Sequence, residues 1–126
     1  MQIPKHLLYT KEHEWLELSG DTAKIGITHH AQDQLGDVVY IDLPDIGTRV
    51  TSGTVLGTIE SVKAVSDLFA PIGGEVIEIN PVLRDHPEAI NSDPYGQAWM
   101  VKLRLQDQSE LAQLLTSEAY TEWLAR

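Results

Sequence analysis

Short segments in which apolar and polar residues alternate cover most of the chain between residues 14 and 105. This period of two is typical of β-strands with one buried face, because successive side chains of a strand point to opposite sides of the sheet. Turn-forming residues separate the segments, as in a small barrel or sandwich. We therefore predict a mainly β fold with strands at residues 14–18, 22–27, 37–43, 54–60, 64–69, 74–79 and 98–105.

Helical patterns are scarce before the last part of the chain. Thr28 is suited to cap a short helix over residues 29–35, and Gly36 is expected to end that helix in a left-handed conformation. The pair Asn80 and Pro81 is expected to open one further helical turn, because proline suits the first helical position.

The last segment, at about residues 107–125, has a helical pattern of its own. Asp107 and Glu110 have the spacing of a capping box, in which two side chains satisfy backbone N–H groups reciprocally. One apolar face of this helix is expected to carry Leu111, Leu114 and Leu115. Ser117 is expected to start a second helix.

The overall charge and the lack of cysteine narrow the possible functions. Nineteen acidic against nine basic residues give a formal net charge of −10, which disfavours binding to nucleic acid because phosphates would be repelled. Without cysteine the chain forms neither disulfides nor thiolate metal sites. No apolar run is long enough to span a membrane, and the first residues lack the apolar core of a signal peptide. We expect a cytoplasmic single domain over residues 1–126.

The sequence contains no motif typical of a metal site or of hydrolytic catalysis. His29 and His30 are adjacent, so on a helix they would face different directions and would not form the i, i+4 pair of a zinc site. A GxSxG nucleophile motif and a glycine-rich phosphate loop are both missing. We therefore expect no bound metal and no enzymatic activity of the chain itself.

Lys63 stands out from the residues around it in the sequence. It is the only basic residue between Arg49 and Arg84, and with Val62 it lies at the tip of the hairpin that the fourth and fifth predicted strands form. A tight turn usually has glycine, asparagine or aspartate at its tip, because the favoured turns need positive φ. We therefore expect a type I or similar turn, held by strand pairing rather than by turn-forming residues.

The surroundings of Lys63 indicate a lysine that is presented rather than activated. Its small neighbours, Ser61 and Ala64, leave the side chain unobstructed. A lysine that reacts as a Schiff base is instead buried in an apolar pocket, because desolvation lowers its pKa. We interpret Lys63 as a site that a modifying enzyme reaches.

The residues around Lys63, ESVKAVSD at 60–67, resemble the lipoylation site of the glycine cleavage system H-protein family. The resemblance extends over essentially the whole chain. The other matching segments, in chain order, are YTKEHEWL at 9–16, IGITHHAQDQLGDVVYIDLPDIG at 25–47, APIGGEVIEIN at 70–80, NSDPYGQAWMVKL at 91–103 and EAYTEWL at 118–124.

This resemblance implies a fold and a role. The family's fold resembles a barrel-sandwich hybrid, as in lipoyl and biotinyl carriers, with added helices, and the lipoyl-binding core would cover about residues 22–104. The family is non-enzymatic, and its lysine, which Lys63 matches, carries amide-linked lipoic acid. The arm would take the aminomethyl group of glycine from glycine decarboxylase (the P protein) to aminomethyltransferase (the T protein). Dihydrolipoamide dehydrogenase (the L protein) would reoxidise the arm, and lipoate-attaching enzymes would be further partners.

Two acidic residues in motifs shared with the family are candidates to contact the loaded arm. An aminomethyl group on sulfur can lose ammonia in water, so a groove that excludes solvent would protect it. The amine is cationic at neutral pH and calls for a carboxylate or another acceptor. Glu14, beside the apolar Trp15, and Asp67, on the strand that leaves the hairpin, are these candidates.

Related roles remain open at this stage. A lipoyl domain of a 2-oxoacid dehydrogenase typically reads DKA at its lysine and is tethered by linkers rich in alanine and proline, whereas this chain reads VKA and has no linker. A biotinyl domain usually has methionine on both sides of the lysine. An H-like protein that donates lipoate to other complexes needs the same lysine, so it stays an alternative.

Overall fold

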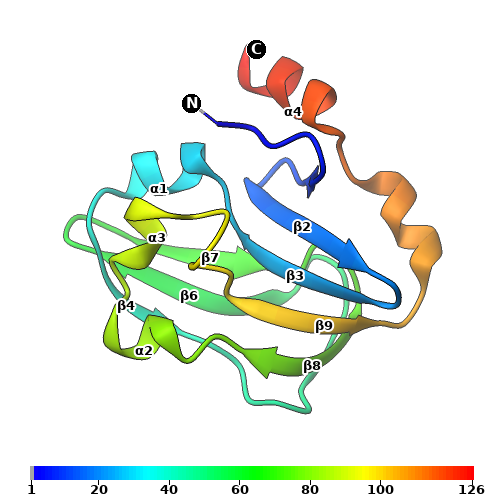
Figure 1. Ribbon diagram of the computed structural model, residues 1–126, viewed down its shortest axis with the longest axis horizontal. Helices are drawn as coiled ribbons and strands as arrows, with labels where there is room; N and C mark the ends of the chain where they lie inside the picture. The colour runs from blue at the N-terminus through cyan, green and yellow to red at the C-terminus, as the bar shows by residue number, and fades with distance from the viewer. Residues whose placement is uncertain (1) are drawn as a thin grey trace.

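The computed structural model describes residues 2–126 and confirms a mainly β fold of two sheets with short helices (Figure 1). The larger sheet has the strand order β1-β2-β3-β9-β8-β5, and the smaller has the order β4-β6-β7. Hydrogen bonds between the described strands do not close these sheets into one barrel. The strands are β1 (Leu8–Tyr9), β2 (Glu14–Ser19), β3 (Thr22–Ile27), β4 (Val38–Asp42), β5 (Arg49–Val50), β6 (Val55–Ser61), β7 (Val65–Phe69), β8 (Gly74–Ile79) and β9 (Val101–Leu105).

Short helices connect several of the strands, and two more follow the last strand. They are α1 (His29–Leu35), α2 (Val82–Asp85), α3 (Ala89–Ser92), the 3-10 helix η1 (Gln108–Gln113) and α4 (Ser117–Leu124). The helix α4 lies near the N-terminal segment, at the opposite end of the view from α2 (Figure 1). None of the helices in residues 2–126 is long and apolar enough to cross a membrane.

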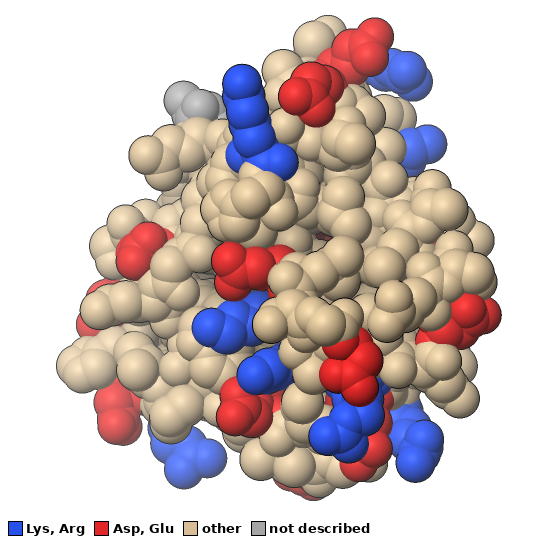
Figure 2. All heavy atoms as spheres, turned by 45° about the vertical axis from the view of Figure 1, so that its right-hand side comes forward, with Lys and Arg blue, Asp and Glu red and all other residues tan. Residues whose placement is uncertain are grey.

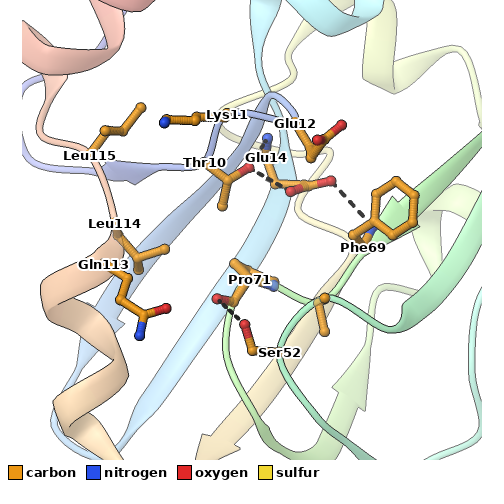
Figure 3. A pocket seen from close by; sticks show the side chains of 12 residues that line it. Thr10, Lys11, Glu12, Glu14, Ser52, Phe69, Pro71, Gln113, Leu114 and Leu115 are labelled. Atoms are coloured by element: carbon orange, nitrogen blue, oxygen red, sulfur yellow. Dashed lines mark hydrogen bonds between the residues drawn. The ribbon is translucent and has the colours of Figure 1, made fainter.

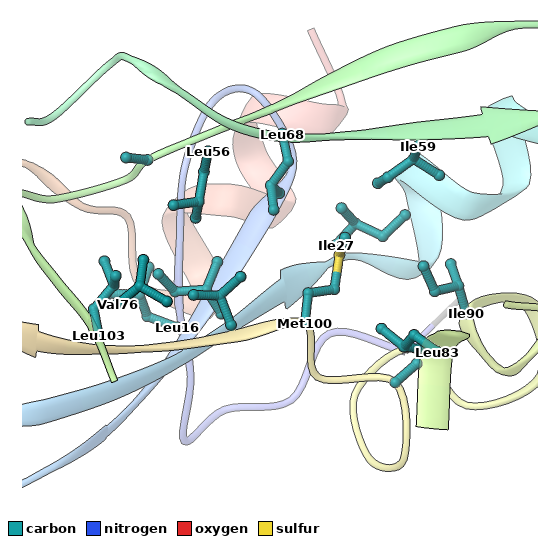
Figure 4. Close-up of a cluster of buried hydrophobic side chains, with 14 of the residues drawn as sticks. Leu16, Ile27, Leu56, Ile59, Leu68, Val76, Leu83, Ile90, Met100 and Leu103 are labelled. Atoms are coloured by element: carbon teal, nitrogen blue, oxygen red, sulfur yellow. The ribbon is translucent and has the colours of Figure 1, made fainter. Parts of the chain in front are cut away.

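The main core lies between the two sheets, as the alternating pattern requires. Leu16 and Val76 point into it from the larger sheet, and Ile59 and Leu68 point into it from the smaller one (Figure 4). Met100 fills the space beside them before β9 begins. A second buried cluster, beneath α4, consists of Leu7, Tyr9, Trp15 and Tyr120.

All seven predicted strands are present, with differences at the edges. The last one begins at Val101 rather than at residue 98. The strands β1 and β5 were not predicted, because two residues are too few to display a period of two. A tight turn joins β2 to β3, and Gly20 supplies its positive φ of 62°. The division into a core over residues 22–104 and a helical segment over residues 107–125 stays a prediction.

The first helix is capped at its N-terminus as predicted, but its end differs from the prediction. The Thr28 hydroxyl accepts the N–H of Ala31 at 3.2 Å. Gly36 has a positive φ of 76°, yet its ψ of −157° is extended, so the predicted left-handed conformation is wrong. The side chain of Asn91 explains the difference, because it donates to the Gly36 carbonyl at 2.8 Å and so fixes its direction.

The predicted capping box near the C-terminus is also wrong. Asp107 does accept the N–H of Ser109, but Glu110 turns away and accepts the N–H of Gly73 at 2.9 Å, in the bend between the sheets. For Glu110, the distant N–H of Gly73 thus replaces the local N–H of Asp107 as the partner. The helix that follows Asp107 is the 3-10 helix η1. The second helix begins at Ser117 as predicted, with Thr116 as its cap.

The close approach of β4 and β6 leads to a test of the fold. A Cβ atom on Gly57 would lie 2.5 Å from the backbone oxygen of Asp42, and that backbone is held by strand pairing. We expect Gly57→Ala to lower the free energy of unfolding by about 1–3 kcal/mol, because the strands must separate. Chemical denaturation measures this change, with Thr58→Ala as the matched control. Equal midpoints for Gly57→Ala and the wild type would contradict the packing described here.

Candidate functional site

Lys63 lies at the exposed tip of the hairpin between β6 and β7. The N–H of Ser61 donates to the carbonyl of Ala64 at 2.8 Å, which closes the hairpin with Val62 and Lys63 at its tip. Neither of these two residues has a positive φ. The predicted turn without positive φ is therefore confirmed.

A turn-forming side chain contributes more to this tip than the prediction from strand pairing allowed. The hydroxyl of Ser61 accepts the N–H groups of Lys63 at 3.3 Å and of Ala64 at 3.1 Å. The N–H of Val62 donates to the carbonyl of Asp37 at 3.0 Å, which ties the tip to the start of β4. A serine at the first position of a turn is the signal that was available, since its side chain often caps the turn.

The amine of Lys63 is accessible. Its Nζ atom has no hydrogen-bond or ion-pair partner among residues 2–126. The aliphatic part of the side chain lies over Gly36, where an added Cβ atom would be 3.4 Å from Cε of Lys63. The lysine thus rests against the end of α1 by apolar contact while its amine stays free to react.

The smaller sheet contrasts in charge with the larger one. Its three strands contain Asp42, Glu60 and Asp67 but no lysine or arginine, and Lys63 lies in the turn that joins two of them. On the larger sheet opposite charges are paired, with Arg49 3.9 Å from Glu75 and Lys102 3.8 Å from Glu78. Acidic and basic side chains are interspersed on the face of the molecule that Figure 2 shows.

A groove of about 470 Å³ begins beside the hairpin and runs between β7, α1 and the start of β2. Its apolar part is formed by Ile27, Ile59 and Phe69. Both acidic residues singled out in the sequence, Glu14 and Asp67, line it. Asp67 is exposed, whereas the side chain of Glu14 is only 2% exposed.

Glu14 is held by two hydrogen bonds, one local and one that connects the two sheets. The hydroxyl of Thr10 donates to its Oε1 atom at 2.5 Å, and the backbone N–H of Phe69, on the free edge of β7, donates to its Oε2 atom at 3.2 Å (Figure 3). Burial raises the pKa of Glu14 to about 7, although both hydrogen bonds lower it, and the nearby Glu12 raises it further. Its charge therefore changes near neutral pH.

A second cavity, of about 420 Å³, lies on the other side of this carboxyl group. Its walls include Ser52, Pro71 and Leu114 as well as Thr10 (Figure 3). Glu14 lines both cavities and so forms part of the wall between them. Within residues 2–126, no three histidine or acidic side chains are placed together to hold a metal ion.

Known proteins resemble this chain along nearly its whole length. The family model described as glycine cleavage H-protein matches residues 7–126. The chain is 51% identical over 120 residues to the glycine cleavage system H protein of Geobacillus kaustophilus, covering 95% of this chain and 94% of that protein. It is 52% identical over 124 residues to the glycine cleavage system H protein of Magnetococcus marinus, covering 98% of this chain and 89% of that protein. The structure also matches the crystal structure of a glycine cleavage system H protein from Mycobacterium marinum, with a TM-score of 0.86 and 35% sequence identity. The match covers 98% of this chain and 99% of that chain.

The raised pKa of Glu14 predicts how stability depends on pH. The folded state binds the proton of this carboxyl group up to about pH 7, whereas the unfolded state releases it near pH 4.5. The wild type should therefore lose stability relative to Glu14→Gln as the pH rises, by about 2 kcal/mol between about pH 5 and about pH 8. Denaturation series on both variants measure this difference, with Glu17→Gln as the control. A difference that does not change with pH would contradict the burial of this carboxyl group.

Proposed function

The chain belongs to the glycine cleavage H-protein family, and on that basis we propose that it is the lipoyl carrier of a glycine cleavage system. Lipoic acid is attached through an amide bond to Nζ of Lys63. The arm carries the aminomethyl group of glycine from the P protein to the T protein, and the L protein reoxidises its dithiol. The chain itself catalyses none of these steps and acts in the cytoplasm.

The observation that carries this proposal is the free amine of Lys63 at the tip of a rigid hairpin. A lipoate-attaching enzyme has to reach the amine, and the exposed tip with the small neighbour Ala64 allows that access. The hydrogen bonds of Ser61 and the contact of Val62 with Asp37 hold the tip in one place. The residues present therefore fit the attached group.

The attached group supplies two sulfur atoms that bind cargo and change redox state. The chain contributes placement, because one fixed attachment point lets a single arm reach several docked enzymes in turn. Tethering also replaces free diffusion by a high local concentration once a partner has docked. The lack of cysteine agrees with this division, since the redox sulfurs come with the cofactor.

The groove beside the hairpin is proposed to hold the arm between enzymes. Ile27, Ile59 and Phe69 offer it an apolar surface. Glu14 and Asp67 are the acceptors proposed for the cationic end of the cargo. A bound cation favours the ionised form of Glu14, whose pKa of about 7 lets it change charge with little cost at neutral pH.

Replacing the attachment residue tests the proposal. Lys63→Arg keeps the positive charge but removes the primary amine that is acylated. We expect this variant to show no lipoyl mass increment and no carrier activity, while its stability changes by less than about 0.5 kcal/mol, because the side chain is exposed. Intact-protein mass spectrometry after treatment with a lipoylating system gives the answer. Lys24→Arg and Lys102→Arg serve as controls, and a mass increment on Lys63→Arg would contradict the assignment.

Removing each carboxylate of the groove tests whether it protects the cargo. The loaded wild type, Glu14→Gln and Asp67→Asn are incubated without T protein, and ammonia release is followed. We expect release roughly threefold to tenfold faster from Glu14→Gln, since a partly desolvated contact with a cation is worth about 1 kcal/mol or more. Asp67→Asn should have a smaller effect because the residue is exposed. Equal rates for all three, matching free aminomethyl-lipoamide, would remove the protective groove.

A further inference from the structure

His13, in the segment between β1 and β2, has an unusual backbone. Its φ of 70° is positive, and within residues 2–126 no other non-glycine residue shares this feature. Its N–H donates to the carbonyl of Thr10 at 3.2 Å, and its own carbonyl accepts the N–H of Thr28 at 3.0 Å. A positive φ is disfavoured for residues with a Cβ atom, so the surrounding contacts must hold His13 in place.

The side chain of His13 belongs to a chain of hydrogen bonds that reaches the C-terminal helix. Its Nδ1 atom lies 2.8 Å from the hydroxyl of Tyr120, in α4. The same hydroxyl lies 2.8 Å from the hydroxyl of Thr28, which accepts the N–H of Ala31. The ring of Tyr120 is buried and stacks on Tyr9 with the ring centroids 4.7 Å apart. Two distant segments thus fix the position of one imidazole.

The buried end of this series of hydrogen bonds, at Thr28, determines where the protons lie. Thr28 is fully buried, and the oxygen of Tyr120 is the acceptor that the described residues offer to its hydroxyl proton. If Thr28 donates to Tyr120, then Tyr120 donates to Nδ1 of His13, and the proton of the neutral ring lies on Nε2. A charged ring would donate from Nδ1 to Tyr120, and one of the two hydroxyl protons, that of Tyr120 or that of Thr28, would then lack an acceptor among the described residues, which is costly in a buried place.

We propose that Tyr120 holds His13 as a neutral imidazole protonated on Nε2, and that α4 thereby keeps positive charge out of the groove wall. The ring of His13 lines the same groove as Glu14 and Asp67. Its importance for the arm depends on the proposed function, because the aminomethyl cargo is a cation. A charged His13 would repel that cation and would compete for the carboxylates, so Tyr120 is a positioning residue for the cargo.

The electrostatic surroundings of His13 agree with a neutral ring. The titratable groups that face it are Glu12 from its own segment, Glu14 at the start of β2, His30 from α1, Asp67 across the groove and Tyr120 from α4. Burial, followed by the ring of His30 at 4.5 Å, lowers the pKa of His13, and Glu12 opposes this only in part. Burial raises the pKa of Tyr120 to about 12, so its hydroxyl keeps the proton that it donates.

Imidazole nitrogen NMR on the unmodified protein tests the state of His13 directly. We expect the wild type to show the tautomer protonated on Nε2, and the pKa of His13 to lie below the ordinary value of a histidine side chain. An Nδ1-protonated tautomer, or titration of His13 at or above that ordinary value, would overturn the proposal. This measurement needs no variant and no lipoic acid.

A single variant tests the part played by Tyr120. Tyr120→Phe keeps the ring that stacks on Tyr9 but removes the hydroxyl, so His13 should become charged at higher pH than in the wild type. Tyr40→Phe is the matched control, because Tyr40 is exposed. An unchanged titration of His13 in Tyr120→Phe would show that another group holds the ring neutral.

Ammonia release from the loaded arm then tests whether the charge of His13 affects the cargo. In Tyr120→Phe, ammonia release from the loaded arm should speed up as the pH falls through the titration of His13, and in the wild type over the same range it should not. If both proteins release ammonia alike, the role of Tyr120 toward the cargo is wrong, while Lys63 remains the attachment site. If neither becomes lipoylated, the proposed function is wrong, and the NMR result still decides the tautomer.

Discussion

The buried carboxyl group of Glu14 is the contact on which the site depends. It joins β2 of the larger sheet to the free edge of β7 in the smaller sheet by accepting the N–H of Phe69, while the nearby hydroxyl of Thr10 donates to its other oxygen. Since β7 also forms one side of the lysine hairpin, this contact holds β7 against the start of β2 where both line the groove beside Lys63. One side chain thus connects the packing of the sheets to the place where an arm would lie.

A carrier protein needs an attachment point that is rigid and a groove that is weakly selective. The hairpin meets the first need through the hydrogen bonds of Ser61 and the tie between Val62 and β4. The groove meets the second with an apolar surface and two carboxylates of different exposure, Glu14 and Asp67. Tight binding of the proposed arm would be a disadvantage, because each partner enzyme would have to draw the arm out of the groove again.

Local patterns predicted the strands and the exposed hairpin well, because strand period, turn residues and helix caps act over a few residues. The prediction failed where a distant partner competes with a near one. Glu110 bonds to Gly73 instead of completing a capping box, and Asn91 sets the conformation of Gly36. The burial of Glu14 could not be predicted for the same reason, since its partner Phe69 lies 55 residues further along the chain.

If the chain is the proposed lipoyl carrier, it serves glycine decarboxylase only in its lipoylated form. This is tested by exchange of labelled bicarbonate into the carboxyl group of glycine by purified P protein, with the chain added in lipoylated or unmodified form. We expect exchange to rise with the amount of lipoylated chain and to stay at the background level with the unmodified chain. Equal stimulation by both forms, or none by the lipoylated form, would contradict the carrier role.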